Sequence, residues 1–145
     1  MMSNHQSVPE IKKQVIFQAP VEKVWKAVST SKGMAEWFMP NDFKAVEGHE
    51  FYIETPFETS HCKVITVDPP YELSFTWGNQ GWLIHFTLQE VENDQTAFTL
   101  IHAGWGDPEE KMHPTGKTRL DTRHTMNKGW ESIVNERLRK VVENG

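Results

Sequence analysis

Short segments in which apolar and polar residues alternate fill the middle of this 145-residue chain, and one long amphipathic helical stretch follows them. Alternation with a period of two is typical of strands in a sheet covered on one face. The turns between the segments are short, which favours antiparallel pairing of neighbours. The expected strands are residues 11–18, 43–46, 50–55, 61–67, 71–77, 82–91 and 96–103. The sequence therefore predicts an α+β fold with a curved antiparallel sheet of six or seven strands.

Three helices are expected beside this sheet. The first begins at Ala19-Pro20, because proline suits the first helical position. The second is capped by Thr30 or Ser31 and ends at Pro40. The third follows Thr118-x-x-Asp121, which resembles a capping box. Its apolar stripe comprises Met126, Trp130, Ile133, Val134, Leu138 and Val141. This long helix should lie across the aromatic face of the sheet, because no other segment is large enough to cover it.

The composition excludes several classes of protein. A hydrophobic share of 37% and a net charge of −5 are typical of an ordinary globular domain and argue against nucleic-acid binding. No apolar run approaches the roughly 20 residues of a membrane-spanning helix, and the first residues lack the pattern of a signal peptide. Cys62 is the only cysteine, so no internal disulfide can form and a cytoplasmic location is expected. We expect a monomer with a disordered tail over residues 1–10 and a single domain over residues 11–145.

Gly129-Trp130 lies in the middle of the long helix. A glycine inside a helix costs about 1 kcal/mol relative to alanine, so some other contribution should offset it. The glycine could allow close approach of the sheet or leave room for a guest beside Trp130, and simple packing is an equally good explanation. The six tryptophans of the chain fit either a bulky core or a pocket with aromatic walls.

Residues that could carry chemistry are few. His102 continues the inward stripe of Phe98 and Leu100, so its imidazole could orient a ligand or could be a structural histidine bonded to backbone or to Trp105. His61 and Cys62 are adjacent on a strand and project to opposite faces, so they cannot form a catalytic dyad. The histidines have no metal-ligand spacing, and no glycine-rich phosphate motif is present. We expect no metal, no cofactor and no acid–base pair.

Four motifs in sequence order carry a resemblance to a known family. They are Ala19-Pro20-Val21-x-x-Val24-Trp25, Trp37-Phe38-x-Pro40, Phe98-Thr99-Leu100-Ile101-His102-x-Gly104-Trp105 and Gly129-Trp130. Together they resemble the activator-of-heat-shock-ATPase homologue family, especially its small bacillus-type members, within the START and pollen-allergen-like (SRPBCC) superfamily. The resemblance implies a helix-grip fold, in which the long helix and the sheet enclose a cavity for lipids, sterols, flavonoids or polyketides. It also implies that relatives include cyclases and an activator of a chaperone ATPase.

The leading hypothesis is a carrier or sensor of a small, planar, mostly apolar molecule, with the loop of residues 104–116 as a lid. The expected ligand-binding residues are Trp37, Phe38, Phe51, Phe75, Trp77, Trp82, Phe86, His102, Trp105, Met126 and Trp130. One alternative is a polyketide cyclase or dehydratase that uses shape and His102. A second alternative is a chaperone-interacting module.

Overall fold

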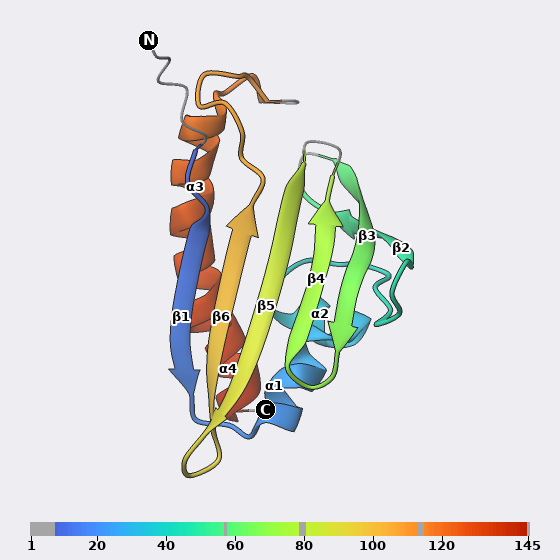
Figure 1. The fold of residues 1–145 in the computed structure, drawn as a ribbon, viewed down its shortest axis with the longest axis vertical. Helices are drawn as coiled ribbons and strands as arrows, with labels where there is room; N and C mark the ends of the chain where they lie inside the picture. The colour runs from blue at the N-terminus through green and yellow to red at the C-terminus, as the bar shows by residue number, and fades with distance from the viewer. Residues whose placement is uncertain (1–7, 57, 79–80, 113–114, 145) are drawn as a thin grey trace.

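One antiparallel sheet runs the length of the molecule, and the helices pack against one of its faces (Figure 1). The computed structural model describes residues 8–56, 58–78, 81–112 and 115–144. The strands are β1 (Ile11–Phe17), β2 (Glu50–Glu54), β3 (Thr59–Asp68), β4 (Glu72–Trp77), β5 (Trp82–Val91) and β6 (Gln95–Ala103). Their order across the sheet is β1-β6-β5-β4-β3-β2, so the first strand pairs with the last. The predicted α+β fold with a curved antiparallel sheet is confirmed.

The sheet has six strands over the described residues, because the expected strand at residues 43–46 does not form. Within that stretch only Phe43 is buried, so the segment has no apolar face to lay against the core. Phe43 instead packs edge-on against Phe51, with ring centroids 5.1 Å apart. Its backbone N–H donates to Asn41 Oδ1 at 2.9 Å. The segment is thus an irregular connection anchored by one aromatic side chain.

The two short helices are α1 (Val21–Val28) and α2 (Ser31–Trp37). Pro20 is the N-cap of α1 and therefore lies one position before the helix, not at its first residue. The hydroxyl of Thr30 accepts a hydrogen bond from the Gly33 N–H at 3.0 Å, which identifies Thr30 as the cap of α2. In the figure both helices lie beneath the end of the sheet opposite the β4–β5 turn (Figure 1).

The long C-terminal helix is built from α3 (Arg119–Ser132), a π-helical stretch η1 (Ile133–Leu138) and α4 (Arg139–Asn144). The predicted cap is confirmed, because the Thr118 hydroxyl accepts from the Asp121 N–H at 3.1 Å. No helix of the described residues is long and apolar enough to cross a membrane.

The π-helical stretch changes which residues of this helix face the core. The fully buried positions in its second half recur every four residues, at Val134, Leu138 and Val142. Positions four apart drift around a regular α-helix, and the wider turn of the π-helical stretch shifts them back toward the core. Val142 is therefore fully buried, and Val141, which the sequence pattern predicted for the stripe, is only partly buried.

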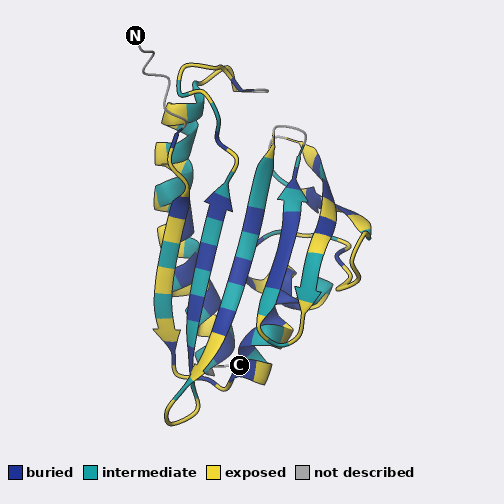
Figure 2. Cartoon of the chain, viewed as in Figure 1, coloured by how far each residue is buried: buried dark blue, intermediate teal, exposed yellow. Residues whose placement is uncertain are grey.

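Alternating side chains from the strands form the core under the helices, as the stripes along β5 and β6 show (Figure 2). Most of β4 is buried on both faces. Inside the stretch that was expected to be a tail, residues 1–7 lie outside the described residues. Val8 is buried, and its N–H donates to the Gly106 carbonyl at 2.8 Å. The chain is thus already held against the loop after β6 at residue 8.

Candidate functional site

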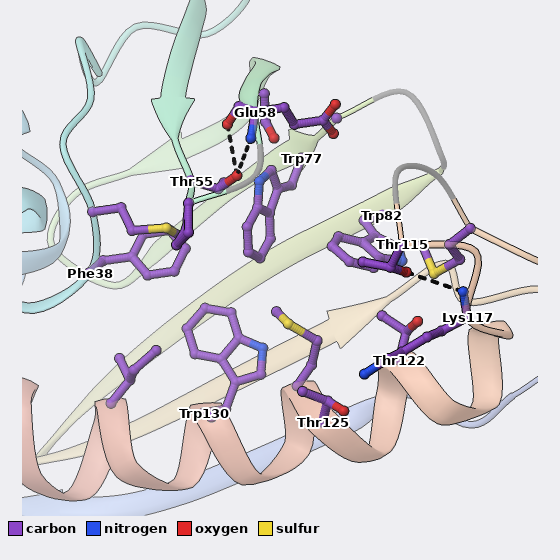
Figure 3. A pocket seen from close by; sticks show the side chains of 18 residues that line it. Phe38, Thr55, Glu58, Trp77, Trp82, Thr115, Lys117, Thr122, Thr125 and Trp130 are labelled. Carbon is purple, nitrogen blue, oxygen red and sulfur yellow. Dashed lines mark hydrogen bonds between the residues drawn. The ribbon is translucent and has the colours of Figure 1, made fainter.

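A cavity of about 300 Å³ lies between the sheet and α3, at the end of the sheet that carries the β4–β5 turn. β4 and β5 supply Trp77 and Trp82, and Gly78 follows β4 directly. α3 supplies five residues from Thr122 to Trp130. The segment after α2, the β2–β3 connection and the loop before α3 add further residues (Figure 3). Ser60 of β3 and Ile133 of η1 complete the lining. At the other end of the sheet, α1 packs against β5 and β6, and α4 packs against β1.

Four aromatic rings form one wall of the cavity. Phe38 stacks on Trp130 with ring centroids 5.3 Å apart and meets the edge of Trp77 at 5.4 Å. Trp77 in turn contacts Trp82, at 5.2 Å. These rings come from α2's end, β4, β5 and α3, so the wall depends on the whole fold. Such a surface suits the face or edge of a planar apolar molecule.

Gly129 opens the helical side of the cavity. A Cβ atom built on this residue would meet no atom within 4 Å, apart from its neighbours and the helix's own backbone. The glycine lines the cavity next to Trp130. Of the explanations left open by the sequence, close approach of the sheet is therefore wrong, and room beside Trp130 agrees with the geometry.

Hydroxyl groups lie around the apolar wall. Thr122 Oγ1 donates to the Thr118 carbonyl at 2.9 Å and Thr125 Oγ1 to the Asp121 carbonyl at 3.3 Å. With their protons used in this way, both oxygens still have lone pairs that can accept hydrogen bonds. The Thr55 hydroxyl both donates to and accepts from the backbone of Glu58 (Figure 3). Two charged residues, Glu58 and Lys117, complete the lining.

His102 lies behind the aromatic wall and is absent from the cavity lining. Its Nδ1 accepts a hydrogen bond from the indole N–H of Trp130 at 2.9 Å. The imidazole also packs against Trp82 and Trp105, each with ring centroids 4.5 Å away. Burial lowers the pKa of His102 to about 3. The inward direction predicted for this side chain is right, and its imidazole is bonded to Trp130. Trp105 donates to the His102 backbone carbonyl at 2.9 Å, and among the described residues no backbone group bonds to the ring nitrogens.

The expected ligand-binding residues divide into two groups in the structure. Five of them line the cavity: Phe38, Trp77, Trp82, Met126 and Trp130. The other six lie outside its lining: Trp37, Phe51, Phe75, Phe86, His102 and Trp105. All six are nearly or fully buried, because the aromatic stripe on the sheet is longer than the cavity and its remainder is filled by the helices and by neighbouring rings. Alternation identifies the face of a strand but not where along that face space remains.

Several lining residues were not among the expected ones. They are Met39, Thr55, Pro56, Glu58, Ser60, Gly78, Met112, Thr115, Lys117, Thr122, Thr125 and Ile133. Most lie on connections or on the first turns of α3, where no apolar periodicity marks them. The threonines of α3 did carry a signal, since Thr122, Thr125 and Gly129 occupy one helical face at spacings of three and four.

The loop expected to be a lid contributes to the cavity through Met112 and Thr115. Arg119, the first residue of α3, contacts this loop through its side chain. Its guanidinium donates to the Trp105 carbonyl at 2.8 Å and forms an ion pair with Glu110. The loop therefore lies over one side of the cavity and is joined to the helix by charged and polar contacts.

The remaining candidates for chemistry lie elsewhere. Cys62 is buried, and burial raises the pKa of its thiol to about 12. Its neighbour His61 faces outward and pairs with Glu50 at 2.7 Å, so the two side chains occupy opposite faces as predicted. Within the described residues, no three His, Cys, Asp or Glu side chains are grouped so that they could hold a metal ion.

The chain is similar to known proteins over nearly its whole length. The family model described as "Activator of Hsp90 ATPase homolog 1-like protein" matches residues 18–143. The solution structure of protein BH1534 from Bacillus halodurans is 49% identical, with a TM-score of 0.88 over 94% of this chain and 99% of that chain. No curated protein sequence matches the chain.

Two more distant structures share the fold alone. The Aha1 dimer from Colwellia psychrerythraea is 21% identical, with a TM-score of 0.74 over 94% of this chain and 97% of that chain. DynU16, described as a protein of the dynemicin biosynthetic locus, is also 21% identical, with a TM-score of 0.69 over 91% of this chain and 46% of that chain. The helix-grip architecture predicted from the four motifs is confirmed by these neighbours.

Proposed function

We propose that this chain, which belongs to the activator of Hsp90 ATPase homolog 1-like family, binds a small, mostly apolar ligand in the cavity and acts as its carrier or sensor. The observation that carries the proposal is open space of about 300 Å³ beside a helical glycine whose Cβ would meet no neighbouring atom. A helix that only packed against the sheet would have no reason to keep both the void and the glycine.

The size and lining of the cavity suggest the kind of ligand. Pockets for small molecules are typically about 300 to 1,000 Å³, mainly apolar and furnished with a few polar groups. This cavity is at the small end of that range, so it suits a compact molecule of one or two rings better than a sterol. The stacked and edge-on rings of Phe38, Trp77 and Trp130 favour a planar body.

A cyclase or dehydratase is the enzymatic alternative. The residue proposed to carry its chemistry is His102, which is hydrogen-bonded to Trp130 behind the aromatic wall of the cavity. Among the described lining residues, the ionisable side chains with a role in acid–base chemistry are Glu58 and Lys117, on separate connections. A chaperone-interacting module is the third possibility, and recovery of a chaperone with the purified protein would favour it. Of the three functions we rank ligand binding first. We further propose that the protein is a monomer in the cytoplasm, a compartment in which its single thiol stays reduced.

The test combines a ligand panel with a variant that fills the cavity. Flavonoids, aromatic polyketides and fatty acids are titrated into the protein while tryptophan fluorescence and amide NMR shifts are followed. At least one compound should move the indole signals of Trp77, Trp82 and Trp130. Gly129→Leu should abolish that response, because its side chain occupies the open space beside Trp130.

Gly129→Ala is the matched control, since it adds one methyl group and leaves most of the cavity open. Both variants should unfold at higher temperature than the wild type, because replacing a mid-helix glycine contributes about 1 kcal/mol. If Gly129→Leu loses binding but gains stability, the loss is due to a filled cavity and not to a damaged fold. The proposal would be contradicted if no compound in the panel changed the tryptophan fluorescence or the NMR shifts, or if Gly129→Leu bound a compound as tightly as the wild type.

A further inference from the structure

We propose that the ligand of this cavity is an organic anion, a compact ring system bearing a carboxylate that pairs with Lys117 at the cavity mouth. This inference rests on the proposed function and names the chemical class that the same cavity would take. It follows from three observations: the position of Lys117, the direction of α3, and the absence of an ion-pair partner for Lys117 among the residues that the structure describes.

Lys117 is the one cationic side chain among the described residues that line the cavity. It directly precedes Thr118, the N-cap of α3, and its backbone N–H donates to the Thr115 hydroxyl at 3.2 Å. Its side chain extends from the loop along the α3 side of the cavity, past Thr122 (Figure 3). A lysine can lay its methylene stem along an apolar wall while its ammonium stays at the opening.

Three other cations near α3 already have acceptors. Arg119 pairs with Glu110, Lys13 with Glu131 at 2.7 Å, and Arg123 donates to the Pro9 and Glu10 carbonyls. No carboxylate of the described residues forms an ion pair with Lys117. Its ammonium is thus available to a ligand, with three donors beside an apolar surface.

The direction of α3 adds to this positive charge. The helix has its N-terminus at the mouth of the cavity, where Thr122 and Thr125 form part of the lining. Helix N-termini favour anions because the backbone dipoles leave partial positive charge there. Asp121 in the first turn offsets part of that charge but is exposed and does not line the cavity.

Glu58 is the competing charged group. It lies across the cavity on the β2–β3 connection, exposed and without an ion-pair partner among the described residues. It has no helix terminus behind it, whereas Lys117 and the N-terminus of α3 act at the same place. We therefore assign the charged end of the ligand to Lys117, and an organic cation held by Glu58 is the outcome that would overturn this assignment.

Three probes that share one ring system make the test. 2-Naphthoate carries the anion, methyl 2-naphthoate is its neutral counterpart, and 2-naphthylmethylammonium carries a cation. Each is titrated into the wild-type protein by NMR at low salt. The anion should bind about tenfold more tightly than the ester, as expected for a partly shielded charge-assisted hydrogen bond.

Lys117→Met keeps the apolar stem of the side chain and removes its charge. In this variant most of the anion's advantage over the ester should be lost, the remainder being the contribution of the α3 N-terminus, and ester binding should be unchanged. Lys111→Met is the matched control: Lys111 lies on the same loop, is exposed and does not line the cavity. This control changes the net charge of the protein by the same amount as Lys117→Met. Because it leaves the cavity lining unchanged, the preference for the anion should remain.

The outcomes separate the two proposals. If the ester binds as well as the anion, or if Lys111→Met lowers anion affinity as much as Lys117→Met, the anion assignment is overturned while the cavity remains a binding site. Tighter binding of the ammonium probe that is lost in Glu58→Gln overturns it as well. If none of the three probes binds and no flavonoid, polyketide or fatty acid of the broader panel binds either, both proposals fail together.

Discussion

The indole N–H of Trp130 donates a hydrogen bond to Nδ1 of His102 at 2.9 Å, joining the long helix to β6 inside the core. An indole nitrogen can only donate, so Nδ1 must be unprotonated and the proton of the neutral imidazole is on Nε2. That second nitrogen is buried and has no hydrogen-bond partner in the described structure. A charged imidazole here would lose its hydration, which is why burial lowers the pKa of His102 to about 3.

The first prediction concerns acid stability. Because the folded pKa of His102 is below its value of 6.5 in the unfolded chain, the unfolded state binds the proton more readily. The resulting stability is complete above pH 6.5 and is lost as the pH falls toward 3. Between pH 7.5 and pH 4.5 the free energy of unfolding should fall by about 2 to 3 kcal/mol from this residue alone. Urea unfolding at the two pH values measures the fall.

His102→Gln is the reference for that measurement. Glutamine keeps a carbonyl oxygen that can accept from the Trp130 indole but does not titrate. Other groups that titrate should contribute almost equally to both proteins, so the difference between the two pH dependences isolates His102. Equal losses in the wild type and the variant would show that His102 is not held neutral by the fold.

The second prediction compares two glycines. Gly129→Ala should raise the free energy of unfolding by about 1 kcal/mol, since its Cβ enters open space. Gly104→Ala should lower it by at least about 2 kcal/mol. Gly104 has φ +85°, and a Cβ there would lie 1.9 Å from the Gly81 carbonyl oxygen. Thermal and urea unfolding measure both changes, and similar effects at the two positions would contradict the geometry.

The sequence predicted the fold well because its signals are local. Alternation marked the inward faces of β4, β5 and β6, and the caps at Thr30 and Thr118 marked where helices begin. The cavity was predicted less well, because void space depends on how rings from distant segments fit together. Phe75 and Trp77 lie on the same face of β4, yet only Trp77 borders the cavity. No pattern in the chain distinguishes these two residues.

The third prediction concerns the single thiol. Cys62 is fully buried, and burial raises its pKa to about 12, so almost no thiolate is present at pH 8. Ellman's reagent should therefore react with the native protein far more slowly than with the unfolded chain. The rate in native buffer, compared with that in concentrated guanidinium, measures this difference. Rapid reaction in native buffer would mean that β3 opens readily.

The last prediction tests the π-helical stretch through two adjacent valines. In a continuous α-helix the stripe through Trp130 and Val134 would place Val141 in the core, whereas the wider turn at Ile133–Leu138 places Val142 there. Val142→Ala should lower the free energy of unfolding by about 2 kcal/mol, because it removes two fully buried methyl groups. Val141→Ala should cost less than about 1 kcal/mol, since that side chain is only partly buried. Urea unfolding of the two variants decides between the registers: a larger loss at position 141 than at 142 would indicate a regular α-helix in solution.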